Sequence, residues 1–294
     1  PLRERGTYLV TGGAGGLGSL FAKELASRYQ ATVILLGRRP SSPETDKLVS
    51  EIEDRAGHAE YVSFDISDAG AMSRCVEAVT QRYGVIHGVI HAAGVTRDSA
   101  LAHKTPEEAA AVLAPKVAGT RALLEATVDQ PLEMFVAFSS VASVLGNFGQ
   151  SDYCYANAFL DHAMSQAAEE RAGKWLSIAW SFWDGVGGMP ASDGVKTWMR
   201  SRMGIEPLGP DDAWTGLSMA LSSDEPHVIV TKGDLNKLSE VFATSIHAAE
   251  AHSDDLAVVA SETEDIALDD LEEDDLAELL CREMDAATKE LGQA

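Results

Sequence analysis

Cysteine is scarce in this chain, and no pattern of metal ligands is present. The three cysteines among its 294 residues, Cys75, Cys154 and Cys281, lack the close spacing of a metal site. An odd number of cysteines is also unsuited to a disulfide framework. Both observations favour a reducing compartment. We therefore predict a cytoplasmic protein without a metal ion.

Basic residues are also few. The chain has 23 Lys and Arg against 46 Asp and Glu, which gives a formal net charge of −23. Nucleic acids and anionic membranes both attract clustered Lys and Arg, so neither is an expected partner. No apolar run is long enough to span a membrane. The first residues lack an initiator methionine and a signal-peptide pattern, so we expect the chain to come from a longer polypeptide.

The apolar content of 45% is enough for a substantial core, and the length allows one large α/β domain with a tail. Acidic residues gather at the end, because residues 247–294 hold sixteen Asp or Glu against two basic residues. We predict a main domain over residues 1–243, a flexible acidic linker over 244–267 and an acidic amphipathic helix over 268–294. That helix could dock on a partner polypeptide, pack on the domain or be largely disordered.

A glycine-rich turn follows the first predicted strand, Thr7–Val10, and precedes a helix over Ser19–Tyr29. This order of strand, turn and helix is the context of a dinucleotide site, where glycines let the backbone approach the pyrophosphate. The helix N-terminus then offers N–H groups and a positive dipole end. We expect the cofactor to contact most of this turn, at Thr11, Gly12, Gly13, Gly15, Gly16, Leu17 and Gly18.

Arg38 and Arg39 follow the second strand, Thr32–Leu36. Many NAD-binding folds carry an acid there for the ribose hydroxyls, whereas arginine accommodates a 2′-phosphate. The pair therefore favours NADPH over NADH. The alternative is two solvated arginines after a strand.

Two further strands end in residues suited to the same cofactor. The strand Glu60–Phe64 is followed by Asp65 and Ile66, where the acid could cap the next helix or receive the adenine amino group. The strand Val85–His91 is followed by the small residues Ala92, Ala93 and Gly94, which would let the cofactor lie against the backbone. Strands alternating with helices predict a Rossmann-like, doubly wound parallel sheet with helices on both faces.

The stretch Phe135–Leu160 is predicted to hold the reactive centre. A strand over Phe135–Phe138 leads to Ser139 and Ser140, and a glycine-punctuated loop then leads to a helix from Tyr153 that also carries Asn157. A hydroxyl at a strand end and a phenol on the next helix can converge on one polar centre. The pattern indicates proton transfer to or from a carbonyl or alcohol.

Lys116 lies near the middle of a helix predicted over Thr105–Leu124. Together with Ser140, Tyr153 and Asn157, it resembles the catalytic tetrad of ketoreductase domains from modular polyketide synthases, in the short-chain dehydrogenase/reductase superfamily. That superfamily usually has Tyr-x-x-x-Lys, whereas Asn157 stands at the lysine position here. Polyketide ketoreductases show the same exchange, with the lysine on the earlier helix. The resemblance runs from about Tyr8 to Leu238 and includes VIHAAGV, FSSVASVLGNFGQ and YANAFLD.

The resemblance implies NADPH-dependent reduction of a β-ketoacyl thioester, carried on an acyl carrier protein, beside neighbouring polyketide synthase domains. Tyr153 would be the acid, with its pKa lowered by the Lys116 ammonium, and Ser140 would bind the carbonyl oxygen. Asn157 would orient the lysine or a relay water. The alternatives are a free-standing short-chain reductase and a non-catalytic reductase-like scaffold.

The resemblance also bears on stereochemistry. Family members giving the D (mostly 3R) alcohol have a Leu-Asp-Asp motif, of which only Asp98 remains in Thr96-Arg97-Asp98. Members giving the opposite alcohol tend to have Trp where this chain has Leu145. We therefore expect the D alcohol, although Asp98 could also be a simple loop or capping residue. Met189 and the apolar residues after it predict a lid over the substrate.

Overall fold

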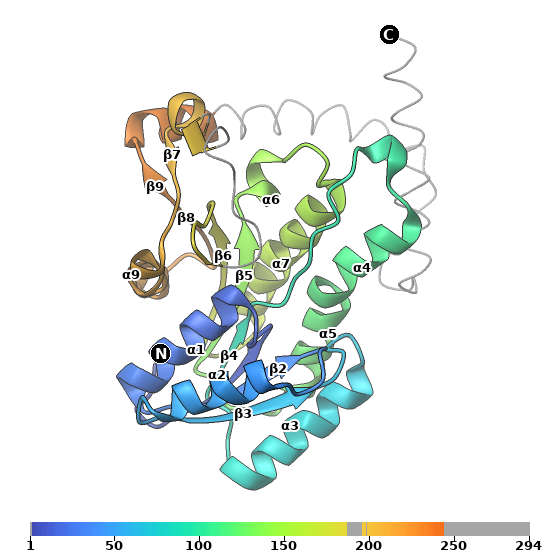
Figure 1. The fold of residues 1–294 in the computed structure, drawn as a ribbon, viewed down its shortest axis with the longest axis vertical. Coiled ribbons are helices and arrows are strands. Elements are labelled where there is room, and N and C mark those ends of the chain that lie inside the picture. The colour runs from blue at the N-terminus through green and yellow to red at the C-terminus, as the bar shows by residue number, and fades with distance from the viewer. Residues whose placement is uncertain (1, 187–195, 198, 244–294) are drawn as a thin grey trace.

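Seven parallel strands form one sheet in the computed structural model, which describes residues 2–186, 196–197 and 199–243 (Figure 1). The strand order is β3-β2-β1-β4-β5-β6-β8, and every neighbouring pair is parallel. The strands are β1 (Thr7–Thr11), β2 (Thr32–Gly37), β3 (His58–Ser63), β4 (Gly88–His91), β5 (Met134–Ser140), β6 (Lys174–Trp180) and β8 (His227–Val230).

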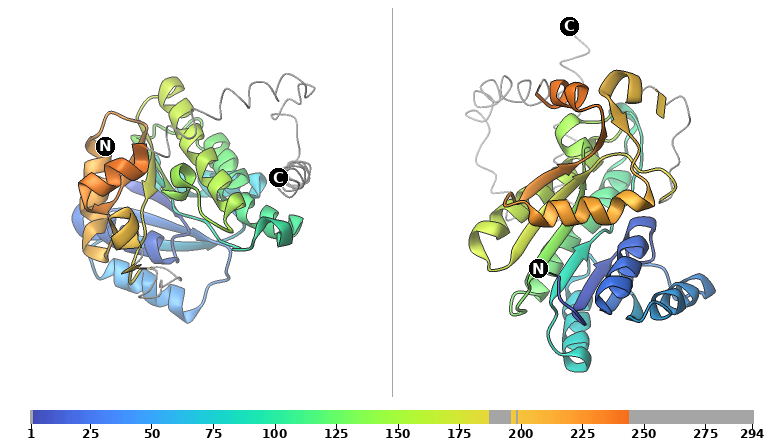
Figure 2. Two further views of the ribbon diagram at one scale, coloured as in Figure 1. Left: turned by 90° about the horizontal axis from the view of Figure 1, so that it is seen from above. Right: turned by 90° about the vertical axis from the view of Figure 1, so that its left-hand side faces the viewer.

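Helices cover both faces of this sheet, as the sequence predicts. Three pack on one face, namely α1 (Gly16–Tyr29), α2 (Pro43–Glu53) and α9 (Pro210–Ser222). Figure 2 shows α1 and α9 side by side there, and the Tyr29 and Trp214 rings meet at 5.9 Å between centroids. The opposite face carries α3 (Ala69–Tyr83), α5 (Ala118–Ala126) and α7 (Ser151–Glu170), while α4 (Pro106–Lys116) packs on α7.

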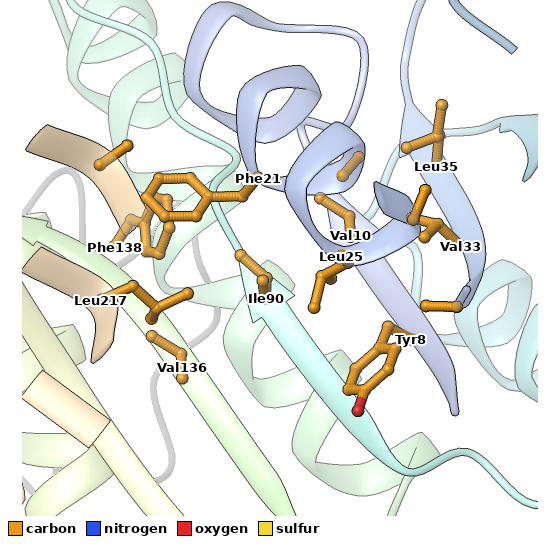
Figure 3. Packing of buried hydrophobic residues seen from close by; sticks show 14 of the residues in the cluster. Tyr8, Val10, Phe21, Leu25, Val33, Leu35, Ile90, Val136, Phe138 and Leu217 are labelled. Atoms are coloured by element: carbon orange, nitrogen blue, oxygen red, sulfur yellow. The ribbon is translucent and has the colours of Figure 1, made fainter. Parts of the chain in front are cut away.

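Alternating side chains along the buried strands build the two halves of the core. Tyr8 and Val10 point to the α1 face, where Leu25 lies beside Val10 and Phe21 lies beside Phe138 of β5 (Figure 3), whereas Leu9 points to the α3 face. Successive residues of a strand face opposite sides, so a sheet covered on both faces requires a continuous apolar run. This explains why the strand sequences are apolar throughout.

The order in which the chain adds strands to the sheet reverses between β1 and β4. The chain moves from β1 outward to β2 and β3, and then returns to place β4 on the other side of β1. In open parallel sheets, the loops at the carboxyl ends of two such strands diverge and leave a crevice for a ligand. The glycine-rich turn follows β1, and Ala92–Gly94 follow β4, so both border this crevice.

The predicted single helix over Thr105–Leu124 is wrong, because the structure has two helices there. Pro115 has no N–H to donate to the preceding turn, and α4 ends at Lys116 before the chain turns at Val117 into α5. Lys116 is therefore at a helix end, not in a helix middle. This position lets its side chain leave the helix toward β5.

Several small elements were not predicted, among them the short helix η1 (Leu101–His103). The glycine-punctuated loop after β5 contains a helical turn, α6 (Ala142–Leu145). Near the end of the described chain, β7 (Ile205–Glu206) and β9 (Lys232–Gly233) form an antiparallel pair. Helix α6 and this pair follow strand carboxyl ends, and Figure 1 shows them toward the same end of the molecule.

Met189, the linker 244–267 and the acidic segment 268–294 lie outside the described residues. The lid and docking-helix expectations therefore stay predictions. In the part of the chain that is described, no helix combines the length and apolar character needed to cross a bilayer. The same part contains no cluster of His, Cys, Asp or Glu that could hold a metal ion.

Candidate active site

The turn after β1 forms a cradle in which several positions have room only for glycine. A Cβ on Gly12 would lie 2.8 Å from the Ala92 carbonyl oxygen, and one on Gly18 would lie 2.2 Å from the Gly12 oxygen. Gly12 also has a φ of +63°, which favours glycine. Helix α1 begins at Gly16, and its N-cap Gly15 supplies no side-chain cap. No side chain therefore caps the N–H groups at the start of α1, which fits a pyrophosphate at this position.

The two arginines after β2 are exposed, and their backbone is fixed by the neighbouring strand. The Tyr61 hydroxyl donates to the Arg39 carbonyl at 2.7 Å, and the Ser63 hydroxyl donates to the Arg38 carbonyl at 3.4 Å. Both residues come directly after β2, which pairs with β1, so they lie near the glycine-rich turn that follows β1. Their position is compatible with a 2′-phosphate.

Asp65 does not cap the next helix, so that alternative is wrong. Its carboxylate accepts hydrogen bonds from the backbone N–H and the hydroxyl of Ser67, at 3.1 and 2.7 Å, while Asp68 is the N-cap of α3. Ile66 is buried against the α3 face of the sheet. The adenine role of Asp65 stays a prediction.

The segment after β4 connects the cofactor cradle to the lysine. The Ala93 N–H donates to the Thr11 hydroxyl at 3.2 Å. A Cβ on Gly94 would lie 2.9 Å from Cε of Lys116, so the missing side chain makes room for the lysine. The cradle and the proposed proton-transfer residues are therefore in direct contact.

His91 is a buried residue of this region that sequence reasoning missed. Its Nδ1 lies 2.6 Å from the Thr11 hydroxyl, and burial, reinforced by the Lys116 charge, lowers the pKa of His91 to about 3. The Thr11 hydroxyl also accepts a hydrogen bond from the Ala93 N–H, so it has two partners inside the fold. Thr11 is thus held inside the fold. The sequence did indicate that His91 lies near the site, because it directly precedes Ala92, a predicted cofactor contact.

The four tetrad side chains gather at the carboxyl end of β5. The Lys116 Nζ donates to the Phe138 carbonyl at 2.8 Å and lies 6.0 Å from the centroid of the Tyr153 ring. The Asn157 amide donates to the Tyr153 carbonyl at 2.7 Å, and its buried Oδ1 has no partner among the described residues. Ser140 ends β5. Sequence positions 116, 140, 153 and 157 therefore form one cluster.

Tyr153 is a neutral phenol in this cluster. Burial raises the pKa of Tyr153 above its ordinary value, and hydrogen bonding by Ser140 and Asn157 offsets only part of that rise. The pKa of Tyr153 is therefore raised overall, contrary to the expectation of a lowered value, because desolvation of the phenolate outweighs the hydrogen bonds from Ser140 and Asn157. A neutral phenol is nevertheless the form that a proton donor requires.

Lys116 is buried, and burial lowers the pKa of Lys116 to about 8, although the Asp161 charge partly opposes the shift. Its ordinary value of 10.5 applies to the unfolded chain. At pH 7 both states are protonated, so the buried charge destabilises the fold in full. Between pH 8 and 10.5 the folded state loses the proton first, and stability rises with pH.

We therefore expect the cofactor-free Lys116→Met variant to be more stable than the parent at pH 7, by roughly 1–3 kcal/mol. The difference should shrink as the pH rises from 8 toward 10. Thermal unfolding at pH 7, 8 and 9 measures it. Lys47→Met, at a side chain 78% exposed, is the control and should show no such trend. A Lys116→Met variant that is less stable by the same amount at every pH would contradict this account.

The two residues that are expected to control stereochemistry, Asp98 and Leu145, lie on segments next to this cluster. The Gln150 amide donates to the Asp98 carboxylate at 2.9 Å, which holds Asp98 against the loop before Tyr153. The alternative that Asp98 caps a helix does not hold, because Thr105 is the N-cap of α4. Leu145 ends α6 and is half-buried.

Comparisons with known proteins agree on one family. Residues 6–185 match the family model for the KR domain. Polyketide synthase PksN of Bacillus subtilis is 36% identical over 246 residues, which is 82% of this chain and 4% of the relative, and PksM of the same organism is 43% identical over 196 residues, covering 67% and 5%. The chain thus spans about one-twentieth of these relatives.

Solved structures point the same way. A ketoreductase domain from the bacillaene assembly line has a TM-score of 0.76 and 37% identity, with 81% of this chain and 58% of that chain covered. An N-terminal ketoreductase from the macrolactin assembly line has a TM-score of 0.75 and 36% identity, with 82% and 47% covered. Both the fold and the sequence similarity extend over the cluster described above.

Proposed function

Since this chain belongs to the KR domain family of polyketide synthases, with the short-chain dehydrogenase/reductase fold, we propose that it reduces a β-ketoacyl thioester to the β-hydroxyacyl thioester with NADPH. The substrate would be carried on an acyl carrier protein among neighbouring synthase domains, in the cytoplasm. Membership of the family makes the chain an oxidoreductase. The cofactor, the carrier and the product configuration are our proposals.

One observation supports this function most directly. The cradle for a dinucleotide and the cluster around Tyr153 are adjacent, with Gly94 packed against Lys116 between them. A reductase needs both parts within reach of one substrate carbon. A binding scaffold would need no buried lysine and neutral phenol beside this cradle.

The cradle fits NADPH. The glycines of residues 12–18 and the N-terminus of α1 would hold the pyrophosphate, Arg38 and Arg39 the 2′-phosphate, and Ala92–Gly94 the backbone side of the nicotinamide half. When bound, the cofactor supplies a hydride for the ketone carbon. The residues around Tyr153 would then stabilise the negative charge that develops on the carbonyl oxygen and protonate that oxygen.

Ser140 and Tyr153 both donate hydrogen bonds to this oxygen. As the carbonyl double bond opens, negative charge grows on the oxygen, and the phenol gives up its proton to form the alcohol. Lys116 stabilises the phenolate that remains. Because the pKa of Lys116 lies below that of Tyr153, the ammonium is the stronger acid and favours return of a proton to the phenolate. The free Oδ1 of Asn157 would hold a water on this route.

Asp98 would select the D alcohol. Its carboxylate is fixed by Gln150, so it stands at a set position beside the tetrad. Leu145 occupies the position at which family members of the opposite stereochemistry tend to have tryptophan. These two features support the D product, although two positions of the Leu-Asp-Asp motif differ.

The cofactor choice is tested at the two arginines. We expect the Arg38→Gln/Arg39→Gln variant to raise the KM for NADPH at least about 100-fold, because each of the two charge-assisted contacts contributes about 1.5–3 kcal/mol. The KM for NADH should change less than about threefold, since NADH has no 2′-phosphate. Steady-state kinetics with both cofactors measures this. Arg55→Gln, at an exposed site after α2, is the control, and equal losses for both cofactors would argue against the assignment.

The proposed function is tested by following NADPH oxidation with a β-ketoacyl N-acetylcysteamine thioester and analysing the product on a chiral column. We expect turnover with mainly the D alcohol. No turnover by the intact chain would contradict the catalytic proposal, whereas mainly L product would contradict only the role of Asp98. Faster turnover of small ketones than of thioesters would favour a reductase of another substrate class.

A further inference from the structure

An ion pair between Lys104 and Asp152 is buried beside the proposed active site. Lys104 follows the short helix η1 (Leu101–His103), and Asp152 lies in the first turn of α7. Their Nζ and Oδ2 atoms are 2.9 Å apart, and the side chains are only 1% and 3% exposed. In each of the other lysine and arginine ion pairs that the described residues make, at least one side chain is 40% exposed or more.

Burial of such a pair is seldom favourable for stability alone. Two charges removed from water lose hydration, and an apolar pair of similar volume is often as stable or more so. A buried pair of this kind can instead fix one arrangement of the chain. Its contacts indicate which arrangement that would be.

The Lys104 ammonium connects Arg97, the residue before Asp98, with Asp152, the residue before Tyr153. The Lys104 ammonium donates to the Arg97 carbonyl as well as to Asp152. The Asp152 carboxylate also accepts a hydrogen bond from the Tyr153 N–H at 2.9 Å. One ammonium group therefore joins the loop of Asp98 to the start of the helix that carries the phenol.

The loop depends on such contacts for its position. Between the end of β4 and the start of α4, η1 is its only regular element in the described structure. Two further contacts hold it to the same neighbour, because the Ser99 N–H donates to the Gly149 carbonyl at 2.9 Å and Gln150 donates to Asp98. All of these contacts lead to residues 149–152, immediately before Tyr153.

We propose that Lys104 and Asp152 are positioning residues that set the Asp98 loop relative to Tyr153, and thereby the orientation in which a keto substrate meets the phenol. This inference rests on the proposed function, since it concerns the same site. Neither residue touches the reacting atoms. Their effect is exerted through the Arg97 backbone and the first turn of α7.

The test compares Lys104→Met, the double variant Lys104→Met/Asp152→Leu and the parent. Val76→Ala, a cavity variant in the α3 core, is the control for loss of stability. Lys104→Met leaves the Asp152 charge buried without its partner, and we expect the amides of residues 96–104 to exchange with deuterium at least about tenfold faster than in the parent. We also expect the minor alcohol to rise at least about tenfold and kcat to fall, with the KM for NADPH unchanged.

The double variant separates positioning from stability. Two apolar side chains should restore the unfolding temperature, but the Arg97 carbonyl still lacks its donor, so fast exchange and mixed product should persist. Recovery of both in the double variant, or parental exchange and product ratio in Lys104→Met, would overturn the proposal. A parent chain without turnover would count against the proposed function instead, and the exchange measurement would still decide whether the pair holds the loop.

Discussion

Replacing Tyr153 with phenylalanine should lower kcat for ketone reduction by about 10²- to 10⁴-fold, the usual contribution of a positioned general acid. The phenol is the group that can give a proton to the carbonyl oxygen, and its raised pKa keeps it protonated at neutral pH. The affinity for NADPH should change less than about threefold, because the cradle lies on β1 and β4 and not on α7. Single-turnover kinetics and a cofactor titration measure the two quantities separately.

Tyr155→Phe is the matched control. Tyr155 lies two residues further along α7, is half-buried like Tyr153, and packs against Leu113 and Val117 of the α4–α5 turn. Loss of its hydroxyl should leave kcat within about twofold, since Tyr155 packs on the α4 side of α7 and substitutions away from a site have small effects. Equal kcat values for the two variants would remove Tyr153 from the mechanism.

Substituting alanine for Gly18 should weaken NADPH binding about 10- to 100-fold and destabilise the fold by about 1–3 kcal/mol, the range for overpacking. A Cβ there would lie 2.2 Å from the Gly12 oxygen, a backbone atom that cannot rotate away. Glycine to alanine inside a helix ordinarily stabilises by up to about 1 kcal/mol. A loss of stability in Gly18→Ala would therefore indicate the close contact at this position, because the helix effect alone would raise stability. Fluorescence titration and thermal unfolding of the same variant measure it.

Gly70→Ala provides the contrast. Gly70 lies in the first turn of α3, and a Cβ there would meet only the flexible end of Arg74 and the Asp68 carboxylate, at 3.3 and 3.4 Å. This variant should be as stable as the parent or slightly more so, with unchanged cofactor binding. If Gly18→Ala behaves in the same way, the cradle does not depend on the close approach at Gly18.

Much of the fold could be predicted from the sequence because this sheet is covered on both faces. Its strands are continuous apolar runs, and the glycine-rich turn marks where the first strand ends, so β1, β2 and β5 were located within three residues. The start of β4 was placed three residues early, since Val85 and Ile86 are apolar but precede the paired residues. The break between α4 and α5 was missed, although a proline inside a helix, here Pro115, is a known cause of helix breaks.

The site was predictable to a different extent. The tetrad was found through resemblance to a family, whereas the pKa of Tyr153 depends on burial that no spacing reveals. The Lys104–Asp152 pair was missed for the same reason, because charged residues in loops are usually solvated. Only the packing of the Asp98 loop on α7 shows that these two charges are enclosed.

The central claim is that this chain transfers a hydride from NADPH to the keto carbon of a β-ketoacyl thioester, with Tyr153 giving the proton. The most direct measurement uses NADPH carrying deuterium at both C4 positions, a β-ketoacyl N-acetylcysteamine thioester and mass spectrometry of the product. We predict one deuterium at C3 of each hydroxyacyl product, formed in step with cofactor oxidation and at least about 100-fold more slowly in Tyr153→Phe. Product without deuterium, or equal rates in the variant, would contradict the account.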